Sequence, residues 1–450
     1  MSMSYAGNVR RDAPERDLAD DRAFPPRLVA WTSTIILMLL FATAYLDRQI
    51  ISLMVNPIRT EFGVGDFEIS LLQGFAFAVL YALCGLPLGM AVDRYPRRWI
   101  VMGGVLIWSC AAMMSGLAES YNQILVARIF VGAGEAALAP AAYSILSDLF
   151  PKRRLTFALG VFMIGALLGA EGSLAIGGYI LHVAADGITV PLLGRLEAWR
   201  FAFVVTALPG FVLAALAIFI HEPARERPAG SGAGWGAVLR FMASRKTFYF
   251  CQIVGFSLVM ALVYARLAWN PTFLIRTYGW SVQQAGYALG AFGFVAGIAA
   301  LLLGGRIVDG MFARGRLDAH FRYYVVGGTI LGLFGIATYL APSPLLFFVG
   351  SLFIIVPLNM GAIGASAVQV ATPPHLRGRI SALYLMSVAL LGMTLGPAVV
   401  GFLTQHVFVN DASIGTALAW TYGILGPITA LLFFAGLGPM RDAVARESDW

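Results

Sequence analysis

Two related stretches decide the fold: "GMAVDRYPRR" at residues 89–98 and "GRIVDGMFARGR" at residues 305–316. Each reads Gly-x-x-x-Asp followed by arginines, and each closes an apolar segment, the second or the eighth along the chain. A further echo pairs "PKRR" at 151–154, after the fourth segment, with "PPHLRGR" at 373–379, after the tenth. Duplication of this kind predicts two similar halves with a cavity between them near the middle of a membrane, the construction of a rocking transporter.

The composition indicates that these segments cross a bilayer. Hydrophobic residues make up 59% of the 450 residues and charged residues 12%, with a mean hydropathy of +0.78, whereas a soluble chain carries roughly 25% charged residues. A span needs about 20 mostly apolar residues. Twelve runs meet that need, at about 28–55, 67–92, 98–118, 122–149, 155–183, 199–220, 247–275, 283–308, 321–341, 344–371, 380–408 and 416–438.

The sequence therefore predicts an all-α membrane protein, with twelve transmembrane helices in two six-helix bundles related by a pseudo-two-fold axis. A stretch rich in proline, glycine and charge separates the halves and marks a linker. No short apolar core with a cleavage site precedes the first span, so no signal peptide is expected. The expected parts are a cytoplasmic tail (1–27), an N-terminal bundle (28–220), a cytoplasmic linker (221–246), a C-terminal bundle (247–440) and a cytoplasmic tail (441–450).

Orientation follows from the loops, because lysine and arginine concentrate on the cytoplasmic side of membrane proteins. If both termini are inside, the outer loops hold only Arg59, Arg195, Arg200 and Arg276. We therefore expect a multi-pass protein of the inner (cytoplasmic) membrane with both termini in the cytoplasm. The inner segments hold Arg94, Arg97, Arg98, Lys152, Arg153, Arg154, Arg225, Arg227, Arg240, Arg245, Lys246, Arg314, Arg316, Arg322, Arg377 and Arg379.

Several function classes are excluded. The net charge of +7 does not point to nucleic acid, because the basic residues lie between apolar spans and form no single polar face. Cys84, Cys110 and Cys251 all fall inside apolar stretches and form no CxxC pair, so a disulfide framework, a metal site and redox chemistry are not expected. With no phosphate-binding GxxxxGK[ST] loop, no catalytic triad and no zinc motif, we expect neither an enzyme nor a cofactor.

Charges inside the spans are the candidate functional residues. In "ARIFVGAGEAAL" (127–138), Arg128 and Glu135 are seven residues apart and so project from nearly the same side of a helix. A charge at the bilayer centre costs roughly 3 kcal/mol or more unless it meets a partner or water. Asp47 and Arg48 lie at a comparable depth in the first span.

The motifs resemble those of the major facilitator superfamily. Gly89-x-x-x-Asp93-Arg94-x-x-Arg97-Arg98 is similar to its most specific signature, and Arg128-x-x-x-Gly132-x-Gly134 to its second motif. Within the superfamily the chain most resembles the Spinster-like branch. The matching stretches are "YLDRQIISLMVNPI" (45–58), "ARIFVGAGEAALAPAAYSILSDLFPKRR" (127–154) and "WNPTFLIRTYGWS" (269–281).

The resemblance implies a proton-linked carrier that exposes its site alternately to each side of the membrane. In this superfamily the first and fourth spans face the central cavity, so we expect the four charges of these spans to meet there. Burial favours the protonated form of a carboxyl group and a nearby arginine favours the ionised form, so moving the arginine would load or release a proton. Asp47 and Glu135 are the expected proton sites, with Arg48 or Arg128 as the partner. The alternatives are that Arg128 and Glu135 form a fixed ion pair that only orients the fourth span, or that Arg128 binds an anionic headgroup.

Two further groups of residues are weaker candidates. Glu171, among small residues of the fifth span, is either a third protonatable group or a hydrogen-bonding contact between helices. The family pattern places a cytoplasmic gate at the inner motif, where an aspartate braces a helix end and latches the outward-open state. The gate residues would be Asp93, Arg94, Arg97, Arg98, Asp148 and Asp309, and the candidate substrate-binding residues are Arg128, Arg266, Trp269, Asn270, Asn359 and Tyr143.

The expected function is proton-coupled transport of an amphiphilic organic solute, with the bilayer and protons as its other partners and a monomer as its form. Animal Spinster proteins are associated with sphingolipids and lysophospholipids, which makes a lipid the solute that the resemblance implies. A symporter of organic anions or sugar acids is the alternative within the superfamily. A membrane receptor or sensor that does not transport is the alternative outside it.

Overall fold

The computed structural model describes residues 24–223, 234–359 and 361–447, without the side chains of Leu86, Asp93, Lys152 and Arg153. Twelve helical segments in this part are long and apolar enough to cross a membrane, which confirms the expected number. Most of the expected N-terminal tail, residues 224–233 of the linker with Arg225 and Arg227, and residues 448–450 lie outside the described residues.

The N-terminal half contains six spans and one small hairpin. Its first, second and fourth spans are each built from more than one helical piece. The elements are α1 (Arg27–Gln49), the 3₁₀ turn η1 (Ile50–Leu53), α2 (Val55–Phe62), α3 (Asp66–Ser70), the π-helical turn η2 (Leu71–Phe75), α4 (Ala76–Arg94), α5 (Arg97–Gly116), α6 (Tyr121–Glu135), α7 (Leu138–Leu149), α8 (Lys152–Val183), β1 (Ile188–Val190), β2 (Gly194–Leu196), α9 (Ala198–Leu216) and η3 (Ala217–Phe219).

The C-terminal half repeats this plan. Its seventh, eighth and ninth spans are single helices, and its tenth span is broken. The elements are α10 (Trp235–Ser244), α11 (Lys246–Tyr278), α12 (Val282–Ala313), α13 (Ala319–Tyr339), α14 (Pro344–Leu358), α15 (Gly361–Val370), α16 (Pro374–Phe402), η4 (Leu403–Val407), η5 (Asp411–Ser413) and α17 (Ile414–Glu447).

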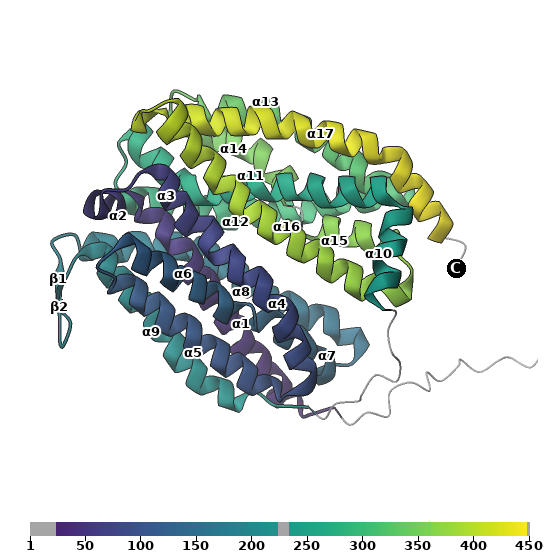
Figure 1. Cartoon of the computed structure of the whole chain (residues 1–450), viewed down its shortest axis with the longest axis horizontal. Coiled ribbons are helices and arrows are strands. Elements are labelled where there is room, and N and C mark those ends of the chain that lie inside the picture. The colour runs from purple at the N-terminus through teal and green to yellow at the C-terminus, as the bar shows by residue number, and fades with distance from the viewer. Residues whose placement is uncertain (1–23, 224–233, 360, 448–450) are drawn as a thin grey trace, which may run out of the picture.

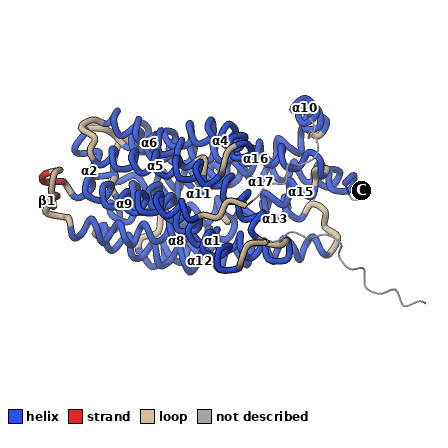
Figure 2. The backbone as a smooth tube through the Cα atoms, turned by 90° about the horizontal axis from the view of Figure 1, so that it is seen from below, coloured by secondary structure: helices blue, strands red, loops and turns tan. Residues whose placement is uncertain are grey.

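The two halves form two bundles of helices that lie side by side. In Figure 1 the purple-to-teal bundle lies below the green-to-yellow one, and most helices run along the long axis of the molecule. Figure 2 shows the same long helices from below, with the short hairpin of β1 and β2 at one end. We call the end at which α1 begins and α17 ends the terminal end, and the opposite end, which carries the hairpin, the distal end.

Local sequence signals explain where several helices begin and end. Ser120 and Ser281 precede α6 and α12, and each hydroxyl accepts a hydrogen bond from an N–H of the first turn. Such caps satisfy donors that have no partner inside the helix. Gly63 and Gly279 end α2 and α11 with φ of 62° and 68°, a left-handed conformation that glycine adopts without steric cost.

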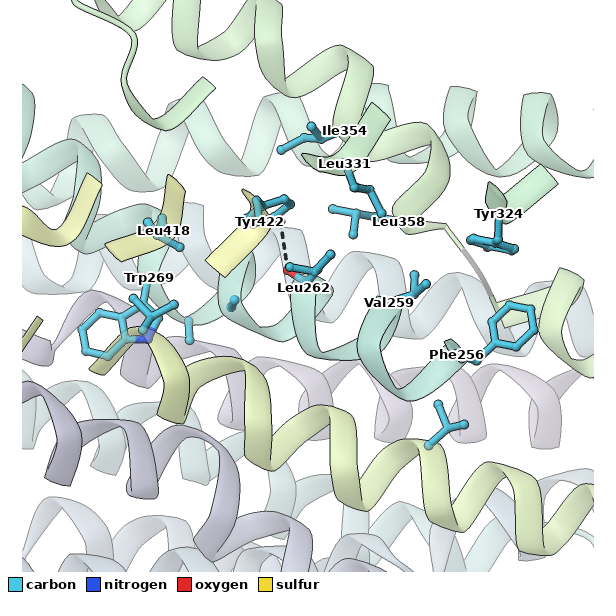
Figure 3. Close-up of a cluster of buried hydrophobic side chains, with 14 of the residues drawn as sticks. Phe256, Val259, Leu262, Trp269, Tyr324, Leu331, Ile354, Leu358, Leu418 and Tyr422 are labelled. Atoms are coloured by element: carbon cyan, nitrogen blue, oxygen red, sulfur yellow. Dashed lines mark hydrogen bonds between the residues drawn. The ribbon is translucent and has the colours of Figure 1, made fainter. Parts of the chain in front are cut away.

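Each half has its own apolar core, and at the distal end the core is shared. The C-terminal bundle packs Phe256, Leu262, Tyr324 and Tyr422 around α11, as Figure 3 shows, and the Tyr422 hydroxyl donates to the carbonyl of Leu262 over 2.9 Å. The same buried cluster continues into side chains of the first two spans, including Ile50, Leu53, Ile69 and Leu72. The two halves are therefore packed together at the distal end.

Polar contacts between the halves lie towards the same end. Among the described residues, the hydrogen bonds and ion pairs that join the two bundles all involve the distal parts of the spans or the distal loops. One such bond runs from Gln73 of η2 to the carbonyl of Ala268 in α11, over 3.1 Å. The bundles are thus closed against each other distally, without such bonds between the described residues of the terminal end.

The structure differs from the sequence-based expectation in three places. The linker contains a helix, α10, which buries Val238 and exposes Trp235 and Leu239. The tenth span breaks at Asn359, two residues after Pro357, a residue that removes a helical hydrogen bond. The last helix, α17, continues to Glu447, beyond the expected end of the bundle at 440.

Candidate functional site

The structure brings the four charges of the first and fourth spans together. Arg48, near the end of α1, forms an ion pair with Glu135, the last residue of α6. Both side chains are buried, with 8% and 2% of their surface exposed. The break in the fourth span follows Glu135 directly, so the Arg48 guanidinium also lies near the C-terminal end of a helix, which favours a cation. Arg48, and not Arg128, is therefore the ion-pair partner of Glu135.

Arg128 has a different set of partners. It is fully buried, and its guanidinium donates to the main-chain carbonyls of Asp47 over 3.0 Å and of Arg48 over 3.3 Å. These carbonyls lie where α1 changes to a 3₁₀ turn, and the last carbonyls of a helix need donors from outside it. Arg128 thus holds the end of α1 against α6, and its charge still acts on Glu135 and Asp47.

Aromatic rings surround Arg48. Its guanidinium lies 4.1 Å from the ring centre of Phe77, 4.7 Å from that of Tyr45 and 5.5 Å from that of Tyr81. Arginine over an aromatic face gains from the negative charge of that face. Tyr264 of α11 also interacts electrostatically with Arg48, and it comes from the other half. The charged pair therefore lies where the two bundles meet.

A row of aromatic rings leads from the rings around Arg48 towards the terminal end. Tyr45 lies 5.1 Å from Phe41, Phe41 stacks on Phe162 at 4.5 Å, and Phe162 meets Tyr143 at 5.8 Å between ring centres. Tyr143 of α7 is 44% exposed, and its hydroxyl lies 3.4 Å from the sulfur of Met163. Tyr143 thus lies at the open end of a row that begins beside Arg48.

The carboxyl group of Asp47 is buried and does not take part in the ion pair between Arg48 and Glu135. Asp47 is 1% exposed, and neither oxygen of its carboxyl group has a hydrogen-bond partner among the described residues. Thr206 of α9 is a polar neighbour, although its hydroxyl donates to the carbonyl of Ala202. Because neighbouring positions on a helix point in different directions, Asp47 and Arg48 face different partners. A buried carboxylate without a donor is costly to keep charged.

A buried acid, Glu171, and a half-buried base, Arg266, interact electrostatically across the boundary between the halves. Glu171 of α8 is buried, and its carboxyl group packs against Gly293 of α12. Arg266 of α11 interacts electrostatically with Glu171 and with Tyr339 and Tyr422 of its own half, and its Nε has no hydrogen-bond partner in the described part of the chain. These positions leave both roles considered for Glu171 open.

The remaining candidate substrate residues have partners within the C-terminal half. The indole of Trp269 is buried and donates to the carbonyl of Pro397 over 3.0 Å. Asn270 is buried and accepts a hydrogen bond of 2.8 Å from Tyr339. Asn359 lies at the break between α14 and α15 and donates to the carbonyl of Gly297 over 3.3 Å. These contacts explain the three side chains as packing between helices.

At the terminal end, Arg97 is the centre of a charge cluster within the N-terminal half. Its guanidinium is 1% exposed and forms ion pairs with Asp148 at 2.5 Å and Glu222 at 2.9 Å. It also donates to the hydroxyl of Ser144 over 2.9 Å and to the carbonyl of Pro223. Arg97 therefore joins the start of α5 to the end of α7 and to the segment that leaves the sixth span.

Glu222 is the member of this cluster that the sequence analysis missed. Burial opposes its charge, but donation from the N–H of Arg98 and from the Arg97 guanidinium lowers the pKa of Glu222 below its usual value. The signal in the sequence is an acid directly after the sixth span, in a loop otherwise rich in arginine. Only tertiary packing shows that it meets Arg97.

The other gate candidates are placed less tightly. Asp93 lies in α4, but its side chain is outside the described residues. Arg94 is exposed, and Arg98 lies over the ring of Trp99 at 5.2 Å. Asp309 is exposed and has no ion pair among the described residues, although it interacts electrostatically with His320. Among the gate candidates whose side chains the structure describes, Arg97 and Asp148 are thus the two joined directly by an ion pair.

Replacing Arg97 with methionine should lower the free energy of unfolding by about 3 kcal/mol, because the change leaves two carboxylates without their shared buried partner. Thermal unfolding in detergent measures the loss. Arg94→Met is the matched control: its exposed side chain should contribute less than about 0.5 kcal/mol. Equal melting temperatures for the two variants would contradict the role given to Arg97.

At the distal end, four charged residues join the halves; we call them the distal latch: Arg59, Asp66, Arg276 and Asp411. Arg276 of α11 donates to both carboxylate oxygens of Asp66, at 2.7 and 3.0 Å, across the boundary between the halves. Arg59 lies 3.2 Å from Asp66 and donates to both oxygens of Asp411 at 2.9 and 3.0 Å. Asp66 is 1% exposed and lies in the first turn of α3, where a negative charge is favourable.

The sequence analysis placed Arg59 and Arg276 in outer loops and did not foresee this latch. Burial lowers the pKa of Arg59, but the hydrogen bond to Asp411 and the charge of Asp66 outweigh it, so the pKa of Arg59 is raised. Asn56 of α2 completes the set by accepting from Arg276 at 2.9 and 3.1 Å. The latch therefore holds a closed distal end.

Asp66→Asn should raise the population with separated distal ends on the order of tenfold, because Arg276 and Arg59 lose the charge that they share. Spin labels at Thr60 of α2 and Ala412 of η5, two exposed positions on opposite halves, report the separation as a distance distribution. Glu61→Gln is the matched control, since Glu61 pairs with Arg200 inside one half. A longer distance in the control alone would refute the latch.

Comparisons with known proteins agree with this architecture. The model of the family described as Major Facilitator Superfamily matches residues 37–397. An "MFS-type efflux pump" of Mycolicibacterium smegmatis is 27% identical over 95% of this chain and 97% of its own length. "Protein spinster" of Drosophila melanogaster is 27% identical, and the match covers 54% of this chain and 39% of that protein. A bacterial homologue of the human lysosomal transporter Spinster, solved in an inward-facing and unoccupied conformation, has a TM-score of 0.77 at 23% identity over 94% of this chain and 99% of its own.

Proposed function

The chain belongs to the major facilitator superfamily, as a Spinster-like member, and we propose that it is a proton-coupled secondary carrier that moves an amphiphilic organic solute by alternating access. It is a multi-pass membrane transporter and not an enzyme.

We take the terminal end to face the cytoplasm, because lysine and arginine concentrate in the loops of that end. The closed distal end then makes the described conformation an inward-facing one. An inner membrane with both chain ends in the cytoplasm follows from the same argument. One chain contains both bundles and both sides of the charge cluster, so we expect a monomer to suffice.

The observation that carries the proposal is the Arg48–Glu135 ion pair, buried where Tyr264 of the second half reaches Arg48. A proton that binds Glu135 would cancel its attraction for Arg48. The Arg48 guanidinium would then keep only its aromatic neighbours. Its contact with the second half, through Tyr264, would gain weight relative to its contact with Glu135. A site that is bistable in this way is what coupling a proton to a conformational change requires. Asp47, buried without a hydrogen-bond donor among the described residues, is the second candidate proton site.

The surroundings of the pair support an amphiphile as the solute. A guanidinium and a carboxylate lie at one end of the row of rings formed by Tyr45, Phe41, Phe162 and Tyr143. A charged head can meet the pair while an apolar tail lies along aromatic surface. A lysolipid or a sphingolipid has this shape, and a sugar acid lacks the apolar tail. Arg266, whose Nε has no hydrogen-bond partner in the portion of the chain that the structure describes, is a second candidate for a headgroup contact.

Transport in proteoliposomes tests the proposal. Purified protein is first screened by thermal shift against lysophosphatidylethanolamine, sphingosine and gluconate. Uptake of each radiolabelled compound is then measured with and without an imposed pH gradient. A proton-coupled carrier accumulates its solute with the gradient and stops when a protonophore is added.

The outcomes separate the alternatives. Accumulation of gluconate alone would favour an organic-anion symporter. Binding of a compound without flux in either direction would identify a receptor and refute transport by this chain. Flux that does not respond to the gradient would remove the proton from the proposal.

A further inference from the structure

We propose that Gln49 is the coupling residue between the charge cluster and the distal closure, because it caps a carbonyl that Pro271 leaves without a partner in the opposite half. The proposal rests on the proposed function insofar as it assumes two alternating states. It adds a specific contact to those states and names the residue pair that makes it.

Pro271 lies inside the long helix α11. Proline has no N–H, so the carbonyl four residues earlier, that of Leu267, lacks its normal helical hydrogen bond. A buried carbonyl without a donor is destabilising, and native structures nearly always supply one. The carbonyl of Leu267 in the seventh span therefore needs a hydrogen-bond donor from outside α11.

The donor comes from the other half. Gln49 ends α1 and is buried, and its side-chain amide donates to the carbonyl of Leu267 over 2.7 Å. Ser52 lies beside the amide, and its hydroxyl donates to the carbonyl of Gln49 over 2.8 Å, which fixes the turn. Gln49 thus completes a helix to which it does not belong, and it can do so only while the distal ends are together.

This arrangement is specific to Pro271. Other prolines interrupt helices of this chain, for example Pro209, Pro357 and Pro397. In the described part of the chain, the carbonyl freed by Pro271 alone receives a side-chain hydrogen bond. The neighbouring carbonyl of Ala268 accepts from Gln73 over 3.1 Å, but its own helical donor, the N–H of Thr272, is present in the sequence.

The position of Gln49 links it to the proposed proton site. It directly follows Asp47 and Arg48, at the point where Arg128 holds the carbonyls of both residues. A movement of Arg48 away from Glu135 shifts the end of α1 and therefore the amide of Gln49. The contact with Leu267 then breaks, and the freed carbonyl meets water on the open distal side.

A double-mutant cycle tests the proposal. Pro271→Ala restores an N–H to α11, so the carbonyl of Leu267 gains an internal partner and Gln49 becomes dispensable. The measured quantity is the population with separated distal ends, from spin labels at Thr60→Cys and Ala412→Cys in nanodiscs. The three native cysteines are replaced by alanine for this measurement, in protein that still transports.

We expect Gln49→Met to raise the ratio of separated to closed molecules about tenfold and Pro271→Ala to suppress that rise in the double variant. Gln49→Asn, which keeps the amide on a shorter arm, should behave like Gln49→Met and is available if methionine impairs folding. Gln73→Met is the matched control, because its effect should be the same with and without Pro271.

Two results would overturn the proposal. One is a distance distribution unaffected by Gln49→Met or Gln49→Asn. The other is a rise of equal size in the Pro271→Ala background, which would show that the amide does not serve the proline-freed carbonyl. A failure of the proposed function looks different: no variant, Asp66→Asn included, would then produce a separated population.

Discussion

Glu135→Gln should abolish uptake driven by a pH gradient while leaving exchange of solute across the membrane at no less than about half of its normal rate. Glutamine has the shape of a protonated glutamate but cannot release or accept the proton. The Arg48 guanidinium then lies beside a neutral amide in every step of the cycle. Because coupling requires the group to alternate between two charges, the gradient loses its means of driving the carrier.

The measurement is accumulation in proteoliposomes compared with counterflow in the absence of a gradient. Glu119→Gln, which changes an exposed acid of the loop before α6, is the matched control and should keep both activities. Loss of counterflow together with accumulation would show that Glu135 binds solute. Normal accumulation in Glu135→Gln would remove this residue from the proton path and leave Asp47 as the candidate.

Arg128→Met should lower the free energy of unfolding by about 3 kcal/mol, because two buried carbonyls at the end of α1 lose a charged donor. Methionine keeps much of the side-chain volume, so the loss reports hydrogen bonds and charge more than a cavity. Thermal unfolding in detergent measures it. The free energy of unfolding of Arg128→Lys should lie between those of the unmodified protein and Arg128→Met, since a lysine reaches a single carbonyl as a point charge.

These two variants also separate the roles considered for Arg128. If it mainly holds α1, Arg128→Lys loses stability but retains solute binding in the fraction that folds. If Arg128 binds an anionic headgroup, the lysine variant would melt like the unmodified protein and lose binding. That second pattern is the opposite of what the hydrogen bonds to Asp47 and Arg48 predict.

Sequence reasoning could predict the number of spans and the meeting of the four charges for clear physical reasons. Twelve apolar runs of sufficient length leave little freedom in an all-helical membrane protein. Depth in the bilayer follows from position along a span, so Asp47 and Arg128 could be placed at one level. Charges in lipid need partners, which made their contact a reasonable expectation.

The choice of partners could not be predicted in the same way. Which of Arg48 and Arg128 meets Glu135 depends on the rotation of α1 about its axis, and packing against α8 and α9 sets that rotation. The short turn at Ile50–Leu53 also frees the carbonyls that Arg128 satisfies. Neither feature leaves a periodic pattern in the sequence.

Contacts between distant parts of the chain were missed for a related reason. Asp66 and Arg276 are both polar residues near span ends, and such residues are common on any membrane surface. Glu222 lies in a linker that already contains several charges. The one signal available was Pro271 inside a span, which implies a free carbonyl but not the identity of its donor.

The central claim is that the charge on Glu135 determines whether the distal ends are together. The most direct measurement is the distance between spin labels at Thr60 and Ala412 in nanodiscs, taken at acid and at alkaline pH for the unmodified protein and for Glu135→Gln. We predict that acid pH increases the population with separated distal ends in the unmodified protein. In Glu135→Gln this population should be raised to a similar extent at acid and at alkaline pH. A shift of the same size in both proteins would assign the pH response to groups other than Glu135 and would contradict the claim.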